Sequence, residues 1–161
     1  NKPVQSKINM DTFKKKSIRQ WLEHLCYVRG FKDTTELKKK LPTIVRKDFL
    51  YVNRTKYKKY ADDVDLLVPK KVVHDYIKDT YGITVSKVSL PVKNGKYLLK
   101  ELWWQDATQV YFDKAVKTKD GAKIILKRKL FGKSVGQNEI TVKPAKNSRG
   151  FVITSIKFYE K

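Results

Sequence analysis

The sequence predicts an α+β fold in which N-terminal helices pack in the concave face of a curved antiparallel meander sheet. Two features lead to this prediction. Over about residues 9–82, apolar side chains recur every three to four positions, which is the spacing of amphipathic helices. Over about residues 83–160, apolar and polar side chains alternate in short runs that tight turns separate. Because 161 residues is a usual length for one domain, we expect residues 1–161 to form a single domain.

Two helices are predicted before residue 48. The first covers about residues 9–29, where Asn9 or Asp11 can cap the start and Gly30 follows the end. The second is shorter and lies within "DTTELKKKLP", because Asp33 or Thr34 can cap it and Pro42 lacks the N–H that a continuing helix needs.

The next segment, "DFLYVNRTKYKKY" (48–60), predicts a short strand, a polar turn and a returning strand. A third helix is expected in "PKKVVHDYIKDTYG". Pro69 can occupy its first position, because the proline ring fixes a helical φ angle. Gly82 can close the same helix, because glycine readily adopts the left-handed conformation found after helix ends.

From residue 83 onward, the sequence predicts six strands in consecutive hairpins. Asn94-Gly95 and Asp120-Gly121 are strong two-residue turn signals, and "AKNSR" before Gly150 is a longer turn. In "AKIILKRKLF", lysines alternate with isoleucine and leucine, so the lysines are expected to face water and the apolar side chains to face the helices. Helices held by a bent meander place the chain in the cone-like or cystatin-like class of folds.

Charge is the most unusual property of the chain, with a formal net charge of +21. Only six of the 37 basic residues are arginine, and the basic residues are spread along the chain. Lysine is a poorer planar reader of bases and phosphates than arginine, which favours general attraction to polyanions over sequence-specific recognition. The candidate polyanion-binding residues are Lys123, Lys127, Lys129 and Lys133. They also interleave with aromatic residues, which leaves nucleic-acid binding open as the alternative.

One stretch runs against this charge, because "YADDVDLLVPKK" gathers Asp62, Asp63 and Asp65 just before a predicted helix. A calcium loop would need further ligands that the following residues do not supply. The first interpretation is structural: acidic groups ahead of a helix complement its dipole and offset the neighbouring lysines. The second is functional, with the three aspartates forming a docking loop for a cationic protein partner.

Motifs for catalysis are missing from the sequence. It contains no nucleotide-binding glycine loop, no nucleophile elbow and no histidine spacing typical of metal sites. Cys26 is the only cysteine, so it cannot form an intramolecular disulfide, and we expect it to be a small buried apolar residue. Glu101, beside Trp103 and Trp104 in "LLKELWW", either lines an apolar pocket or belongs to the core. We therefore predict a non-enzymatic protein without a cofactor or a metal.

Three segments carry a resemblance to a known group of proteins. They are "VSLPVKNGKYLLKELWWQDATQVYFDKAVKTKDGAKIILKRKLF", "GFVITSIKFYEK" and "DVDLLVPKKVVHDYIKDTYG". Together they resemble extracytoplasmic NTF2-like domains of Gram-positive bacteria and the hacksaw-fold inhibitor of cell-wall DL-endopeptidases. The chain departs from these domains in its higher positive charge and in residues 30–60. The resemblance implies a secreted or surface-anchored binding domain, and an inhibitor role in which the Asp62–Asp65 loop enters a basic cleft of a hydrolase.

The predicted partners follow from charge and resemblance together. We expect the lysine-rich surface to hold the protein near anionic cell-wall polymer or lipid headgroups. A start at Asn1 rather than methionine, followed by polar residues, predicts a processed N-terminus. A cytosolic nucleic-acid-binding protein of phage or plasmid origin is the alternative.

Overall fold

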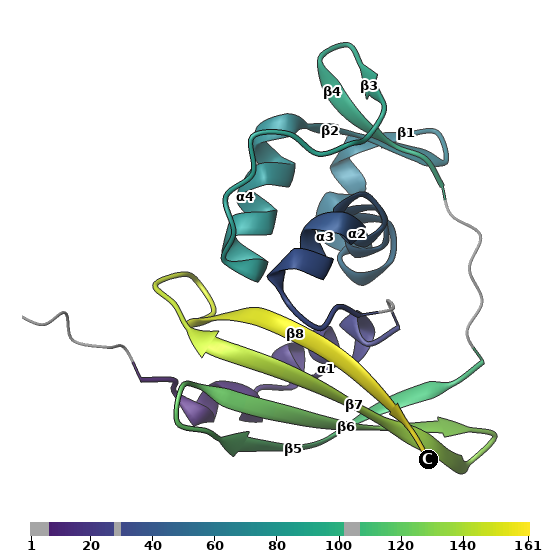
Figure 1. Cartoon of the computed structure of the whole chain (residues 1–161). Helices are drawn as coiled ribbons and strands as arrows, with labels where there is room; N and C mark the ends of the chain where they lie inside the picture. Colours follow the sequence, from purple (N-terminus) through teal and green to yellow (C-terminus); the bar gives the residue numbers. More distant parts are fainter. Residues whose placement is uncertain (1–6, 28–29, 102–106) are drawn as a thin grey trace, which may run out of the picture.

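The computed structural model of the protein describes residues 7–27, 30–101 and 107–161 (Figure 1). Its helices are α1 (Lys16–Leu25), α2 (Thr34–Lys47), α3 (Arg54–Tyr57) and α4 (Lys70–Tyr81). Short helical turns precede α1 (Met10–Lys14), follow α2 (Asp48–Val52) and follow α3 (Lys58–Tyr60). No helix in the described part of the chain is long and apolar enough to cross a membrane.

The strands form two antiparallel sheets, which confirms the predicted α+β class. The small sheet has the order β1-β2-β4-β3, with β1 (Ala61–Asp62), β2 (Asp65–Pro69), β3 (Val92–Lys93) and β4 (Lys96–Leu99). The large sheet is a meander in the order β5-β6-β7-β8, with β5 (Gln109–Lys117), β6 (Ala122–Leu130), β7 (Lys133–Pro144) and β8 (Phe151–Glu160). The expectation of one six-strand meander was therefore wrong, because its first hairpin joins a separate sheet.

Buried cross-strand pairs between β2 and β4 hold that hairpin in the small sheet. Leu66 of β2 is opposite Leu99 of β4 and Val68 is opposite Tyr97, and all four side chains are buried. The Tyr97 hydroxyl also accepts a hydrogen bond from the Val88 N–H at 3.1 Å, which holds the preceding segment as a loop instead of the expected strand.

The predicted boundaries of the first two helices needed correction. The first predicted helix breaks at Lys15, whose backbone is extended, and Arg19 Nε donates to the carbonyl oxygen of Phe13 across the break at 2.6 Å. Asp33 caps α2 as expected, by accepting from the Glu36 N–H at 2.9 Å. However, α2 continues through Pro42, because burial of its apolar side after the proline outweighs the lost hydrogen bond.

The segment 48–60 is helical rather than extended, contrary to prediction. Its aromatic residues pack inward, with Phe49 and Tyr57 stacked at a centroid distance of 4.0 Å. Phe49 also meets Tyr76 of α4 edge-on at 5.0 Å. Burial of this aromatic cluster against α4 selects the helical conformation. The third helix, α4, ends at Gly82 as predicted, with a φ of 72°. It begins at Lys70, because Pro69 is the last residue of β2 and the N-cap of the helix, not its first residue as predicted.

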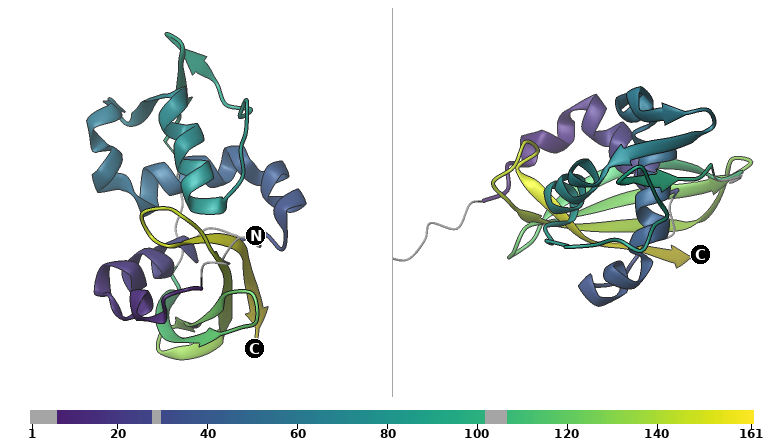
Figure 2. Two further views of the ribbon diagram at one scale, coloured as in Figure 1. Left: turned by 90° about the vertical axis from the view of Figure 1, so that its left-hand side faces the viewer. Right: turned by 90° about the horizontal axis from the view of Figure 1, so that it is seen from above.

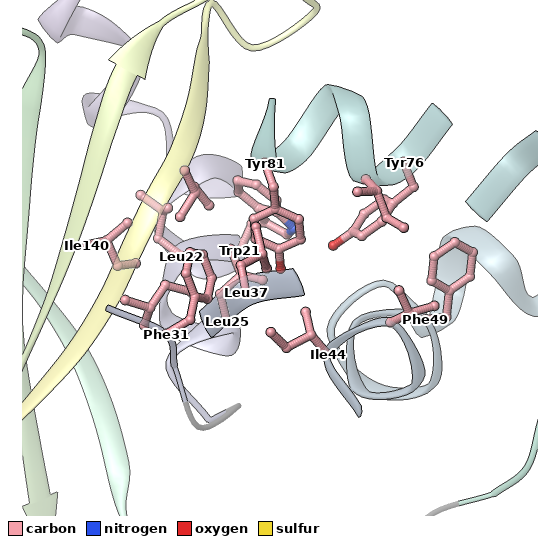
Figure 3. Packing of buried hydrophobic residues seen from close by; sticks show 14 of the residues in the cluster. Trp21, Leu22, Leu25, Phe31, Leu37, Ile44, Phe49, Tyr76, Tyr81 and Ile140 are labelled. Carbon is pink, nitrogen blue, oxygen red and sulfur yellow. The ribbon is translucent and has the colours of Figure 1, made fainter. Parts of the chain in front are cut away.

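The helices occupy two positions around the large sheet. Figure 2 shows α1 and the turn before it on one side of the meander, and α2, α3 and α4 beyond the edge formed by β8. One hydrophobic cluster includes residues of both positions and of both sheets. In Figure 3, the labelled residues of α1 lie near Phe31. Tyr81 of α4 extends toward the same group and meets Phe31 edge-on at 5.5 Å, while Tyr76 lies on the side of Phe49. The opposite, outer face of the meander carries the lysines of β6.

Candidate polyanion-binding groove

The predicted polyanion-binding lysines lie together at the outer face and end of β6, but acidic side chains accompany them. Lys123 Nζ is 3.9 Å from a carboxylate oxygen of Glu139, and Lys127 Nζ is 3.9 Å from one of Asp113. Lys129 Nζ lies 5.8 Å from the centre of the Tyr111 ring. Lys133 is exposed at the start of β7. These lysines share one surface, and carboxylates partly offset its positive charge, so binding of a polyanion at this surface stays a prediction.

A more strongly basic surface lies at one end of the meander, where the β5–β6 and β7–β8 connections meet. A cleft of about 580 Å³ there is lined by five exposed lysines and one acidic residue, Asp120. The lysines are Lys7, Lys117, Lys119, Lys143 and Lys146. Among the described residues, none of the five lies within 4.0 Å of a carboxylate oxygen. The cleft thus concentrates positive charge that no acidic side chain in residues 7–27, 30–101 and 107–161 neutralises by contact.

A second cleft, of about 780 Å³, lies between α3, α4 and the β7–β8 loop. Its basic side chains are Lys56, Lys59, Lys78, Lys146 and Arg149, and its aromatic side chains are Tyr57, Tyr60 and Tyr76. The two aspartates of this cleft are already paired: Asp75 with Lys71 at 2.6 Å, and Asp79 with Arg149 at 3.2 Å. Basic groups over aromatic rings can hold anionic ligands that also present apolar or sugar-like surface.

Ala145 and Lys146 line both clefts, so the two clefts adjoin and make up one basic surface region. We call it the basic groove; it comprises Lys7, Lys56, Lys59, Lys78, Lys117, Lys119, Lys143, Lys146 and Arg149, with Asp75, Asp79 and Asp120 as its acidic members. In Figure 1 it corresponds to the end of the sheet where the yellow β7–β8 loop approaches α4.

The β7–β8 loop is fixed in place, so the groove is formed before any ligand binds. Asn147 Nδ2 donates to the carbonyl oxygens of Asp79 at 2.8 Å and Phe151 at 2.9 Å. The Arg149 guanidinium lies 3.8 Å from the centre of the Trp21 ring. The loop is therefore anchored both to the C-terminal end of α4 and to α1.

The acidic segment forms a hairpin turn, which corrects the helix-dipole interpretation. Asp62 ends β1 and pairs with Lys93 at 3.2 Å, while Asp63 sits in the turn with a φ of 58°. Asp65 Oδ1 accepts from the Glu101 N–H at 2.7 Å. Asp65 begins β2, and the rest of this strand lies between the three aspartates and α4, whose first turn contains no acidic residue.

Glu101 lies in the same surface region as two of these aspartates. Glu101, Asp63 and Asp65 line a cleft of about 530 Å³ together with Arg54 and Lys58. Glu101 is exposed, and the pocket that the sequence placed around it with tryptophans remains untested, because Trp103 and Trp104 lie outside the described residues. The cleft carries charges of both signs and is less basic than the groove.

Asp48 is the most perturbed acidic group, and it is fully buried. Burial raises its pKa to about 7, although hydrogen bonds from Tyr81 and Tyr76 and the charge of Lys47 act in the opposite direction. Both tyrosine hydroxyls donate to Oδ2, at 2.7 Å from Tyr76, whereas Oδ1 has no hydrogen-bond partner among the described residues. Because no solvent reaches this carboxyl, it belongs to the folding energetics rather than to a ligand site.

Cys26 is buried as expected, and burial raises its thiol pKa far above its ordinary value, so it is not a nucleophile. The described residues contain no group of three or more potential metal-ligating side chains.

Comparisons with protein-family models, curated proteins and solved structures found no match. The resemblance to NTF2-like and hacksaw-fold domains therefore stays a prediction.

Proposed function

We propose that this protein is a non-enzymatic, extracytoplasmic binding domain of a Gram-positive bacterium whose basic groove binds an anionic cell-wall polymer. The observation that carries the proposal is the concentration of nine basic side chains against three aspartates in one preformed groove, two of the aspartates already being paired. A flexible polymer with repeating phosphates can follow such a groove, releasing counterions at each lysine.

The chemistry of the groove favours a poly(polyol phosphate) of the teichoic-acid type. Lysine ammonium groups bind phosphate as point charges and need no fixed planar partner. In the α3–α4 part of the groove, Lys56 and Lys59 lie 5.4 Å and 5.3 Å from the ring centres of Tyr57 and Tyr60. Tyr57 is buried in the core, so it is the partly exposed ring of Tyr60 that offers surface to the polyol or sugar between two phosphates.

The test replaces three groove lysines together, in the variant K119Q/K143Q/K146Q, and measures its affinity for soluble poly(glycerol phosphate) at about 50 and about 200 mM salt. The expected loss at the lower salt is at least about tenfold, and the dependence of log affinity on log salt should become shallower by about 2. A matched control, K38Q/K39Q/K87Q, removes the same charge from exposed lysines outside the groove and should change affinity by less than about twofold. Equal losses in both variants would mean that net charge, not the groove, binds the polymer.

Single-stranded nucleic acid is the second candidate ligand, and one row of residues on the outer face of the meander favours it. Tyr111, Lys127, Gln137 and Tyr159 are successive partners across the four strands. The two tyrosines are 45% and 46% exposed, as bases stacking on them would require. If Y111A/Y159A lowers oligonucleotide binding at about 200 mM salt and the groove variant leaves polymer binding intact, nucleic acid becomes the preferred ligand.

The acidic turn between β1 and β2 is a second candidate binding site, for a protein partner. We propose it as a docking site for a cationic surface, such as that of a cell-wall hydrolase. The supporting observation is that Val64, 58% exposed, projects between Asp63 and Asp65 at the tip of the β1–β2 turn. The variant D62A/D63A/D65A should lose binding to such a partner, and unchanged binding would exclude this role.

A further inference from the structure

The turn between β6 and β7 presents an aromatic side chain to solvent. Phe131 is 90% exposed, more than any other large apolar residue described. Phe131 and Gly132 form a two-residue turn between the paired residues Leu130 and Lys133, and both have positive φ angles, of 49° and 79°. These are the signs of φ found in the tight hairpin turns that favour Asn-Gly.

Phenylalanine gains nothing from this position in the folded chain. A bulky residue with positive φ is conformationally disfavoured compared with asparagine or glycine. Its ring does not belong to the hydrophobic cluster or to the partly buried residues around it, and the side chain of the adjacent Leu130 does not either. A side chain that is unfavourable for the turn and unused by the core points to a role outside the folded chain.

The charges beside Phe131 indicate what that contact is. Lys129 and Lys133 flank the turn on β6 and β7. Lys161 lies beside the same strand, because its N–H donates to the carbonyl oxygen of Val135 at 3.2 Å. Glu160, opposite Gly136, is the one acidic residue paired along this end of β7 and β8. An exposed phenyl ring with lysines beside it is complementary to an anionic bilayer. The phenyl ring can enter the interfacial layer while the lysines contact the headgroups.

We propose that the β6–β7 turn is a membrane-contact tip, in which Phe131 inserts into the interfacial layer of an anionic phospholipid bilayer and Lys129 and Lys133 bind its headgroups. The inference rests on the proposed function to the extent that an extracytoplasmic location places the tip near such a membrane. It also adds a second partner, because no groove residue belongs to the tip.

The two surfaces lie at opposite ends of the meander. In Figure 1 the β6–β7 turn is at the end marked by C, and the β5–β6 and β7–β8 connections are at the other end. Strand β6 has nine residues, which corresponds to a separation of about 30 Å. A protein held to the bilayer by Phe131 would therefore direct the basic groove away from the membrane and toward the wall polymer.

The experiment measures co-sedimentation of the full chain with vesicles of phosphatidylglycerol and phosphatidylcholine, and with vesicles of phosphatidylcholine alone. The test variant is Phe131→Asn, because asparagine suits the turn and the fold is retained or strengthened. Binding to the mixed vesicles should fall at least about tenfold, whereas Phe131→Trp should bind at least as well as the original chain. The variant K129Q/K133Q should weaken binding by roughly fivefold for each lysine removed.

Two readouts separate this inference from the proposed function. F131N should keep its affinity for poly(glycerol phosphate), and K119Q/K143Q/K146Q should keep the larger part of its vesicle binding. If F131N binds mixed vesicles as the original chain does, the tip is not a membrane contact, and polymer binding in the groove is unaffected by that result. If polymer binding is absent but vesicle binding still requires Phe131, the proposed function is wrong and the membrane contact stands.

Discussion

Replacing Asp48 with asparagine is expected to abolish a loss of stability that the original chain undergoes between about pH 4 and pH 7. Asp48 is fully buried, and burial raises its carboxyl pKa from 3.8 to about 7. Three pKa units correspond to about 4 kcal/mol of free energy of unfolding, which is a large part of the stability of an ordinary domain. The variant should therefore gain stability relative to the original chain as the pH rises.

The sign follows from proton binding in the two states. Between about pH 4 and pH 7 the folded chain keeps a proton on Asp48, whereas the unfolded chain has released it. The unfolded state then binds fewer protons, so the free energy of unfolding falls as the pH rises. Above about pH 7 the buried carboxyl ionises in the folded state as well, and the penalty becomes constant. Below about pH 4 both states are protonated, and the difference disappears.

Asparagine is the suitable replacement because it imitates the protonated acid. Its side-chain oxygen can accept from the hydroxyls of Tyr76 and Tyr81, as Oδ2 of Asp48 does. Its amide then occupies the position of Oδ1, which has no partner among the described residues. The neutral side chain thus keeps the acceptor and removes the buried charge.

Urea unfolding followed by circular dichroism, at intervals from pH 4 to pH 8, measures the effect. The difference in free energy of unfolding between Asp48→Asn and the original chain should grow by up to about 4 kcal/mol over this range. Asp63→Asn removes one exposed acidic group from a turn, and is the control for the change in net charge. Parallel profiles for the original chain and Asp48→Asn would show that the carboxyl ionises as easily in the folded state as in the unfolded one.

The basic groove could have been partly predicted from the sequence. In a meander, alternate turns lie at the same end of the sheet, so the turn at Asp120-Gly121 and the loop before Gly150 must be neighbours. Lys117 and Lys119 come just before the first, Lys143 comes just before the second, and Lys146 lies within the second. The number of lysines along a single strand is instead highest in β6, but carboxylates on the neighbouring strands offset the charge of these lysines. The sequence signal for the basic groove is therefore the position of lysines next to turns, not the number of lysines in a strand.

Other parts of the fold depend on contacts distant in sequence, and local patterns could not predict them. Segment 48–60 has the aromatic content of a strand, yet stacking of Phe49 on Tyr57 and contact with α4 make it helical. The continuation of α2 past Pro42 likewise depends on burial of Ile44 and Val45. Where turn chemistry is local, as at Asn94-Gly95 and Gly82, the predictions were confirmed. The hairpin at Asp120-Gly121 also forms, but its loop has the four residues 118–121 instead of the predicted two.

Gly30→Ala is expected to destabilise the fold by about 3 kcal/mol or more, because its added methyl group makes the shortest contact of any at the seven glycines. An alanine Cβ at this position would lie 1.8 Å from the carbonyl oxygen of Ile156, far inside van der Waals contact. The obstacle is backbone, and it cannot move freely, because the Ile156 N–H donates to the Phe31 carbonyl oxygen at 2.9 Å and Ile140 of β7 is its partner on the other side.

The close contact at Gly30 also holds the segment that follows α1 against strand β8. Gly95→Ala is the matched control: no atom lies within 4 Å of its added Cβ, so only the strain of a φ of 72° remains, at about 1 kcal/mol. If both variants unfold with the same dependence of free energy on denaturant concentration, their denaturant midpoints compare their stabilities directly. The midpoint of Gly30→Ala should be much the lower. A Gly30→Ala midpoint equal to that of Gly95→Ala would mean that β8 yields to the methyl group, and that the sheet is less firmly held against α1 than the contact implies.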